Sequence, residues 1–254
     1  MWTYVRAFCF AAPLIVVATA LLGTVSFLTT LFDRSGRAAH RVARLWSRVL
    51  LAVAGVKAEV EGLERIAPNG SYVIASNHLS LMDTPLVLAH LPLQFRFLAK
   101  KSLFRIPFIG THLRRAGHVS IPREDARGSL KAMAEAARLL RERGISMLVF
   151  PEGTRSTGEL GAFKEGAAYL AIQAGVPLVP VAIAGTGTIL PPGSVILRPG
   201  PVRMRVGQPI PTGGLTLQDR TRLTALLRER IQEMLRRPAG LVAGGGFEPP
   251  TFGL

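Results

Sequence analysis

Cysteine and acidic residues are scarce in this chain of 254 residues. Cys9 is the only cysteine, which excludes an internal disulfide and a zinc site built from cysteines. Asp and Glu together number 16 against 31 Lys and Arg, so the formal net charge is +15. Such a surplus implies an anionic partner. Composition alone leaves open nucleic acid, an anionic bilayer, or acidic substrates and carriers.

Charge is also missing from an N-terminal run, residues 8–32, and this absence favours a membrane over nucleic acid. The mean hydropathy of the whole chain, +0.32, is high for a soluble protein. As a helix, the run would reach roughly 37 Å, enough to cross the hydrocarbon core of a bilayer. A cleaved signal peptide is one alternative, although the run is long for one. A hairpin that dips into one leaflet is another, because Pro13, Gly23 and several hydroxyl side chains interrupt the run.

The next segment has no acid between Asp33 and Glu59 and carries arginines at helical spacing. On an ideal helix they fall within an arc of roughly 80°, opposite a set of apolar residues. This pattern is typical of a helix in an anionic interface, with arginines at the headgroups and the apolar side among the acyl chains. The alternative is a surface helix packed on the core. The arginines are Arg34, Arg37, Arg41, Arg44 and Arg48, and the apolar residues are Val42, Trp46, Val49, Leu50 and Val53.

Short β-like runs alternate with helical stretches from about residue 57 onward. This alternation predicts an α/β layered domain with a central, mostly parallel sheet flanked by helices. Gly144 and Gly175 are expected to end two of the helices as C-caps. The predicted strands are 72–75, 95–99, 119–121, 146–150 and 179–183, with an added hairpin at 195–206. The predicted helices are 81–91, 124–143, 165–174 and 216–236.

The chain therefore divides into three parts. Residues 1–56 form N-terminal membrane-associated helices, and residues 57–238 form the α/β domain. Residues 239–254 are rich in Gly and Pro and lack periodicity, so we expect a disordered tail.

A histidine and an aspartate five residues apart follow the first predicted strand of the α/β domain and open a helix. His78 and Asp83 can meet if the histidine lies in the turn and the aspartate in the first helical turn. Ser80 would then be the N-cap and Asp83 the N3 residue of a capping box. Asp83 could accept from one imidazole nitrogen and leave the other as a base. The alternative is a capping aspartate beside an incidental surface histidine.

A second motif, Phe150-Pro151-Glu152-Gly153-Thr154-Arg155, follows the strongest buried run. Turns at the carboxyl ends of strands are where open α/β sheets bind ligands. Glu152 and Arg155 would project there, and a guanidinium suits a phosphate. The alternative is a tight turn with a surface ion pair. The remaining histidines, His40, His90, His112 and His118, show no metal-ligand spacing, so no metal site is expected.

Two further blocks complete an ordered set. Residues 100–110 and 117–123 form one block between the two motifs, and residues 176–181 form another after the glutamate turn. These four blocks, in this order, resemble the glycerophosphate acyltransferase family, most closely its 1-acylglycerol-3-phosphate (lysophosphatidate) acyltransferase branch. The resemblance covers about residues 72–183. Members also carry an N-terminal membrane-associated helical motif, which the arginine segment resembles.

The resemblance implies a role for each matching residue. His78 and Asp83 would be the catalytic dyad, and Lys100, Arg123 and Arg155 would hold the acceptor phosphate. Glu152, Gly153 and Thr154 would shape the acceptor site, and Val179 and Pro180 would lie on the acyl-donor side. No metal or cofactor is implied beyond the acyl donor, which is acyl-CoA or acyl carrier protein.

The expected reaction is direct transfer of a fatty acyl chain to the free hydroxyl of 1-acylglycerol-3-phosphate, giving phosphatidic acid. One alternative is an acyltransferase for another lyso-lipid, such as a lysophospholipid or a lyso-ornithine lipid. Another is a catalytically silent basic protein that binds membranes. The expected partners are anionic membrane lipids, lysophosphatidic acid and the acyl donor, with no nucleic acid. The arginines and the positive-inside rule place the protein at the cytoplasmic face of the cell inner membrane.

Overall fold

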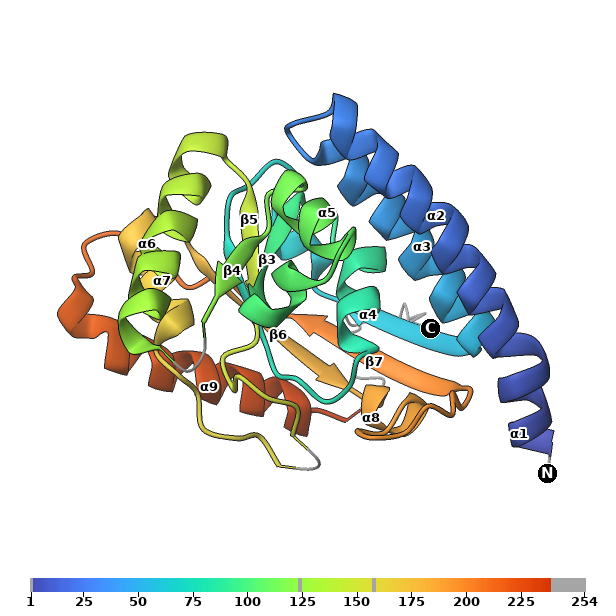
Figure 1. Ribbon diagram of the computed structural model, residues 1–254. Helices are drawn as coiled ribbons and strands as arrows, with labels where there is room; N and C mark the ends of the chain where they lie inside the picture. The colour runs from blue at the N-terminus through green and yellow to red at the C-terminus, as the bar shows by residue number, and fades with distance from the viewer. Residues whose placement is uncertain (1, 123–124, 157–158, 239–254) are drawn as a thin grey trace, which may run out of the picture.

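A computed structural model describes residues 2–122, 125–156 and 159–238 of the chain. Its centre is a seven-stranded sheet with the strand order β1-β7-β6-β2-β5-β3-β4 (Figure 1). All neighbouring strands run parallel except β6 and β7. The predicted α/β class with a mostly parallel sheet is therefore confirmed. The strands are β1 Val56–Glu61, β2 Val73–Ser76, β3 Phe95–Lys100, β4 Val119–Ile121, β5 Ser146–Val149, β6 Leu178–Ala184 and β7 Gly200–Val206.

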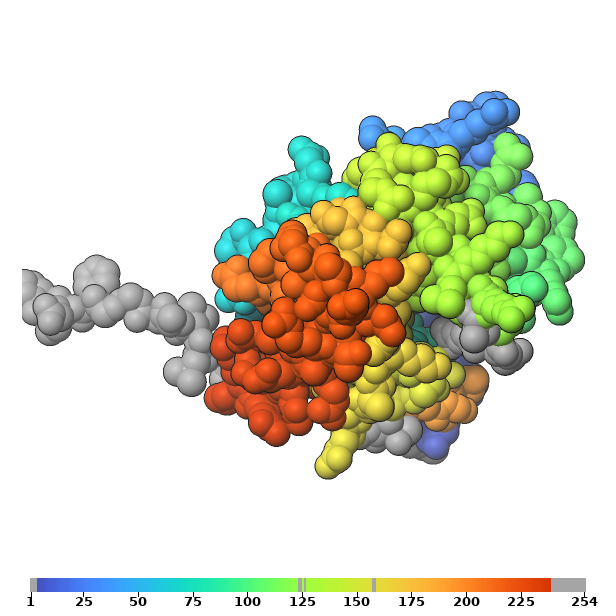
Figure 2. Space-filling model, turned by 90° about the vertical axis from the view of Figure 1, so that its left-hand side faces the viewer, coloured from blue at the N-terminus to red at the C-terminus, as the bar shows by residue number. Residues whose placement is uncertain are grey.

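The middle strands are apolar and fully buried because helices cover both faces of the sheet. Every residue of β2 and β5 is buried, as expected for central strands of a parallel sheet. Helices α3 Arg37–Ala54 and α4 Asp83–His90 pack on one face. Helices α6 Ala126–Arg143, α7 Gly166–Ala174 and α9 Arg220–Arg236 pack on the other. Figure 2 shows α6 and α9 on this second face, with α7 between them.

Several element boundaries differ from the prediction. Gly144 and Gly175 end α6 and α7 in the left-handed conformation, as predicted. The predicted hairpin at 195–206 is wrong, because only β7 forms there and it pairs with β6 and β1. The short α8 Thr186–Ile189 and an irregular loop join β6 to β7. The edge strand β1 and helix α5 Ile109–Arg115 were not predicted, although Val56, Ala58 and Val60 of β1 alternate with charged residues; α5 has only seven residues.

The N-terminal segment folds as a helical hairpin. A short helix α1 Trp2–Val5 and a π-helical segment η1 Arg6–Ala11 lead into α2 Ala12–Phe32. Residues Arg6–Phe32 are long and apolar enough to cross a membrane, and little of this stretch is buried. Yet α2 runs back along α3. Arg6 Nη2 donates to the Val53 carbonyl at 2.9 Å, and Trp46 Nε1 donates to Thr19 Oγ1 at 3.0 Å.

Helix α3 lies between α2 and the domain, which corrects one prediction. Arg37, Arg41 and Arg48 are exposed, as the arginine stripe predicted. Leu50, however, is buried in the core of the α/β domain rather than facing lipid. Part of the apolar side of α3 is therefore packed on protein, and α2 carries most of the exposed apolar surface of the hairpin.

Buried polar groups fix the α2–α3 turn to the sheet. Arg96 of β3 is 1% exposed, and its Nη2 donates to the Ser35 carbonyl at 2.7 Å. His40 of α3 is also buried, and its Nε2–H donates to the Leu93 carbonyl at 3.0 Å. Burial, with the nearby Arg96 charge, lowers the pKa of His40 to about 4. These two hydrogen bonds, rather than salt bridges, attach the hairpin to the α/β domain.

We expect acid to weaken the fold through His40. Above its usual pKa of about 6.5 the imidazole is neutral in both the folded and the unfolded chain, so its titration does not change the free energy of unfolding there. As the pH falls from about 6.5 towards the folded value, only the unfolded chain takes up the proton. The free energy of unfolding therefore falls, by about 2 kcal/mol between pH 6.5 and pH 5. Urea unfolding in detergent micelles at pH 7 and pH 5 measures this loss. His40→Gln, which cannot titrate, should lose about 2 kcal/mol less, and an equal loss in both proteins would contradict the assignment.

Candidate active site

His78 and Asp83 meet at the carboxyl end of β2. His78 lies in the turn after the strand, and Asp83 is the first residue of α4. The Nδ1 atom of His78 lies 2.7 Å from Oδ2 of Asp83. Because a carboxylate can only accept, the proton of the neutral imidazole is on Nδ1 and its Nε2 carries a free lone pair. The side chain of His78 is 18% exposed, so part of the imidazole reaches the surface of the protein.

Four hydrogen bonds fix the Asp83 carboxylate, which has no exposed surface. Besides His78, the backbone N–H groups of Leu79 and Ser80 donate to Oδ2 at 2.7 and 2.9 Å. The hydroxyl of Thr186 donates to Oδ1 at 2.5 Å. The carboxylate thus ties the turn after β2 to the turn after β6.

The predicted capping box is only half present. Asp83 does reach back to the Ser80 N–H, but α4 begins at Asp83 with Met82 as the N-cap. The Ser80 hydroxyl accepts from the Met82 N–H at 3.2 Å and donates to the Leu190 carbonyl at 2.7 Å. The tight turn therefore starts the helix two residues later than predicted, because the Asp83 carboxylate is shared with His78 and Thr186.

The motif after β5 supports the backbone of His78. Glu152 is buried, and its Oε1 accepts from the His78 N–H at 2.8 Å. Its Oε2 accepts from the Gly161 N–H at 3.0 Å. The Ser156 N–H donates to the His78 carbonyl at 2.8 Å. Both peptide groups of the histidine are therefore held by the loop after β5.

An aromatic ring completes the support of the imidazole. The ring of Phe150 stacks on His78 with 4.1 Å between centroids and 18° between planes. Beneath the pair, Asn77 exchanges two hydrogen bonds with the Ile183 backbone of β6, at 2.9 and 2.8 Å. The contacts of Phe150, Asn77 and Thr186 were missed from the sequence, since none of these residues forms a pattern with His78 by spacing.

Two of the three residues predicted to hold the phosphate, Lys100 and Arg155, lie in the segments at this edge. Thr154 and Arg155 are exposed in the loop that also holds Ser156 against His78. Lys100 is exposed at the carboxyl end of β3, the strand next to β5. Arg123 lies outside the described residues. Gly153 makes the turn with a φ of +74°, a conformation that favours glycine.

Val179 and Pro180, predicted on the acyl-donor side, are buried in β6. They pair with Ile74 and Ala75 of β2, so they build the sheet under the site rather than its open surface.

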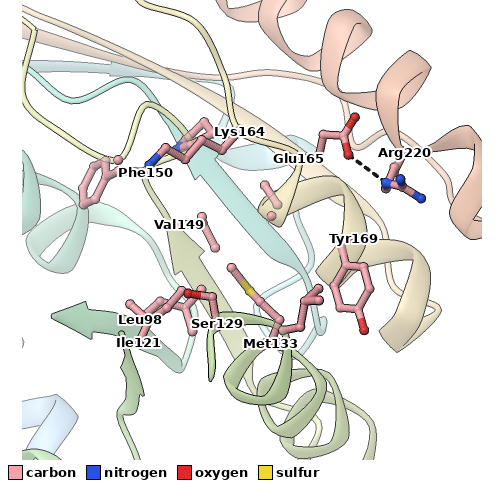
Figure 3. Close-up of a pocket in the computed structure, with 15 residues that line it drawn as sticks. Leu98, Ile121, Ser129, Met133, Val149, Phe150, Lys164, Glu165, Tyr169 and Arg220 are labelled. Carbon is pink, nitrogen blue, oxygen red and sulfur yellow. Dashed lines mark hydrogen bonds and ion pairs between the residues drawn. The ribbon is translucent and has the colours of Figure 1, made fainter. Parts of the chain in front are cut away.

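A cavity of about 440 Å³ adjoins the dyad on the other side of Phe150. Its wall is mostly apolar and comes from β3, β4, β5, α6 and α7, with Leu98, Ile121, Met133 and Val149 along it (Figure 3). Lys164 and an ion pair between Glu165 and Arg220, 2.7 Å apart, lie at its rim. Its volume is in the range of small-molecule sites, and its apolar wall suits a hydrocarbon chain.

Comparison with known proteins gives consistent matches. Residues 57–184 match the family model described as Acyltransferase. The chain is 36% identical to 1-acyl-sn-glycerol-3-phosphate acyltransferase BAT2, chloroplastic, from Brassica napus, over 81% of this chain and 61% of that protein. It is 31% identical to 1-acyl-sn-glycerol-3-phosphate acyltransferase alpha from Homo sapiens, over 81% of this chain and 73% of that protein. The chain thus spans less than two thirds of the length of BAT2.

A solved structure extends the match to nearly the whole chain. The 1-acyl-sn-glycerophosphate (LPA) acyltransferase PlsC from Thermotoga maritima aligns with a TM-score of 0.75 at 26% identity. The alignment covers 94% of this chain and 100% of that one. With the four sequence blocks in place, these matches show that the chain belongs to the acyltransferase family that includes the 1-acyl-sn-glycerol-3-phosphate acyltransferases.

Proposed function

We propose that this protein transfers a fatty acyl chain from a thioester donor to the free hydroxyl of 1-acylglycerol-3-phosphate, giving phosphatidic acid. The observation that carries the proposal is the His78–Asp83 pair, with its carboxylate held by four hydrogen bonds and its imidazole partly exposed. The names of the related proteins supply the substrate class. A thiol-release assay with acyl-CoA and a panel of lyso-lipids tests it.

In the proposed mechanism His78 acts as a general base. Its Nε2 takes the proton of the acceptor hydroxyl as the hydroxyl oxygen attacks the thioester carbonyl carbon. The tetrahedral intermediate then collapses, the carbon–sulfur bond breaks, and the imidazolium returns the proton to the leaving thiolate. A positioned base of this kind is worth about 10²–10⁴ in rate. The acyl group moves directly, so no acyl-enzyme forms.

Asp83 holds the imidazole in the productive tautomer and stabilises its positive charge during transfer, as the aspartate does in a serine-protease triad. Glu152 and Phe150 fix the position of the histidine rather than taking part in proton transfer, because the first bonds its backbone and the second its ring face. Such positioning matters because small displacements of a catalytic group lose large factors in rate.

Cationic side chains around the dyad suit a phosphate acceptor. Arg155 and Lys100 follow the two strands next to β2 on one side and lie at the same edge as His78. A guanidinium can bind phosphate through two parallel hydrogen bonds. The donor is acyl-CoA or acyl carrier protein, both anionic, and the apolar cavity behind Phe150 suits the acyl chain of one substrate. No metal or further cofactor takes part.

The hairpin is proposed to hold the protein on the cytoplasmic face of the cell inner membrane. Arg6, just before α2, and Thr19, within α2, bond to Val53 and Trp46 of α3, and α3 is packed on the α/β domain. We therefore propose that α2 stays against the domain and does not span the bilayer. Its outward apolar residues enter one leaflet instead, and the exposed arginines of α3 contact anionic headgroups.

The dyad yields the first test of this function. His78→Ala should abolish thiol release, and Asp83→Asn should lower kcat by orders of magnitude through the tautomer. Thr186→Val should lower kcat roughly 10- to 100-fold, since one hydrogen bond to a buried carboxylate is lost. His90→Gln, at the other end of α4, is the matched control and should leave kcat unchanged. Activity near wild type in His78→Ala would sink the mechanism.

Substitution of Arg155 is the second test of the proposed function. Arg155→Ala should raise the apparent KM for lysophosphatidate more than the KM for acyl-CoA, because the phosphate contact is lost. Arg155→Lys should restore it only partly. Arg138→Ala, an exposed arginine on α6, serves as the control for the loss of one surface charge. If only the donor KM rose, Arg155 would belong to coenzyme A binding.

Substitution of the exposed arginines of α3 is the third test, and it concerns the proposed membrane location. Replacing Arg37, Arg41 and Arg48 with Gln should weaken binding to anionic vesicles at low salt by about 1 kcal/mol per residue. The difference from wild type should shrink as salt shortens the screening length. Co-sedimentation across a salt series measures both effects. The same affinity in both proteins at low salt would show that the arginines do not contact the bilayer.

A further inference from the structure

The segment between β3 and α5 exposes apolar side chains that no part of the described protein covers. We define residues 101–109 as the β3–α5 connector; it includes the 3₁₀-helix η3 Lys101–Arg105. Its exposed fractions are 41% for Leu103, 43% for Ile106, 77% for Phe108 and 49% for Ile109. Single exposed apolar residues are ordinary, but a contiguous group of this size marks an interaction surface.

The backbone holds the most exposed of these residues in a strained conformation. Phe108 has a φ of +62°, the one positive φ among the described residues that are not glycine. The Ile109 N–H donates to the Pro107 carbonyl at 2.6 Å, which makes Phe108 the centre of a three-residue γ-turn. A bulky residue in such a turn is strained, and strain of this kind is concentrated at functional sites. Here the turn directs the phenyl ring outward.

The connector lies beside α2, the apolar helix of the hairpin. The ring of Phe108 meets the ring of Phe27 edge to face, with 6.3 Å between centroids. A cavity of about 780 Å³ opens between α2, α3 and the start of α5, lined largely by apolar side chains such as Leu22, Phe27, Trp46 and Ile109. A largely apolar cavity and the Phe27–Phe108 contact therefore connect the exposed surface of α2 to the connector.

The charges around the connector are of one sign. No acid occurs between Asp83 and Glu124, a stretch that includes the whole connector and α5. Lys101 and Arg105 are exposed within the connector, and Arg114 and Arg115 are exposed on α5. Apolar side chains with a basic surround match the boundary between acyl chains and anionic headgroups.

We propose that the β3–α5 connector is a second membrane-contacting element, which inserts Phe108 and its apolar neighbours into an anionic bilayer beside α2. This inference rests on the proposed membrane location of the hairpin. Continuity with α2 favours lipid over an acidic protein partner, since lipid chains would also fill the apolar cavity between the two elements. The connector follows Lys100 directly, so its insertion brings the edge of the sheet that carries the dyad down to the headgroups.

Site-specific fluorescence tests the insertion. Cys9, the only cysteine, is exposed and labels the hairpin in the unmodified chain with an environment-sensitive dye. The double variants Cys9→Ser/Phe108→Cys and Cys9→Ser/Glu229→Cys label the connector and, as control, the exposed side of α9 on the opposite face of the sheet. On vesicles of phosphatidylglycerol and phosphatidylcholine, the labels at 9 and 108 should shift to the blue. Quenchers on the lipid chains should reach both labels, while the label at 229 stays in water.

The outcomes separate the two proposals. If the label at 9 is shielded and the label at 108 behaves like the one at 229, the connector does not insert and the inference is wrong, although the hairpin binds the membrane. If all three labels stay in water, the membrane location itself fails as well.

A kinetic experiment shows what the insertion does. Phe108→Gly keeps the turn, because glycine adopts positive φ without strain. It should lower activity several-fold on lysophosphatidate in vesicles and leave activity on a short-chain, water-soluble acceptor unchanged. Leu217→Ser, which removes an exposed leucine on the far face, is the matched control. If Phe108→Gly instead raised only the KM for acyl carrier protein, the connector would be a carrier-docking surface, and the lipid assignment would be overturned.

Discussion

The site depends on one buried carboxylate. Asp83 has no exposed surface, and no lysine or arginine pairs with it among the hydrogen bonds of the described residues; it is satisfied by two backbone N–H groups, a threonine hydroxyl and the imidazole. A carboxyl group buried this deeply is tolerated only when it is well hydrogen-bonded. The tight turn at Leu79–Ser80, the start of α4 and the position of Thr186 therefore all follow from the need to satisfy it.

Sheet topology brings these groups together from distant parts of the chain. The strand order β6-β2-β5-β3 places four carboxyl ends side by side. Thr186 follows β6, His78 follows β2, Glu152 follows β5 and Lys100 ends β3. Each of these strands contributes one group in the order of the sheet. Parallel pairing alone therefore arranges the candidate base, the residues that position it and a cation along one edge. This is the location where open α/β sheets bind ligands.

The sequence predicted the parts of this arrangement that are local or periodic. Buried strands such as 146–149 and glycine-ended helices have short-range signals, and the five-residue spacing of His78 and Asp83 already implied a turn. Thr186 lies 103 residues from Asp83 and Glu152 lies 74 from His78, so their bonds depend on strand order, which no local pattern encodes. The edge strand β1 and the short α5 were missed because their residues are half exposed. The apolar side of α3 was assigned to lipid because the same pattern could equally face lipid or protein.

Buried polar contacts of the hairpin decide whether α3 faces lipid or protein. A helix whose apolar side faced lipid would have no need of buried polar partners, whereas His40 and Arg96 are buried and bond carbonyl groups of Leu93 and Ser35. Such bonds are worth most where water is excluded, so they form only when α3 packs against protein. With α3 fixed to the sheet, only the side of α2 that faces away from α3 is left for lipid. The attached α/β domain limits how deeply α2 can enter a bilayer. The exposed apolar surface of α2 and the sheet edge that carries His78 are then parts of one folded unit. Under the proposed function, this arrangement would bring the acyl donor and a bilayer-borne acceptor to the same histidine.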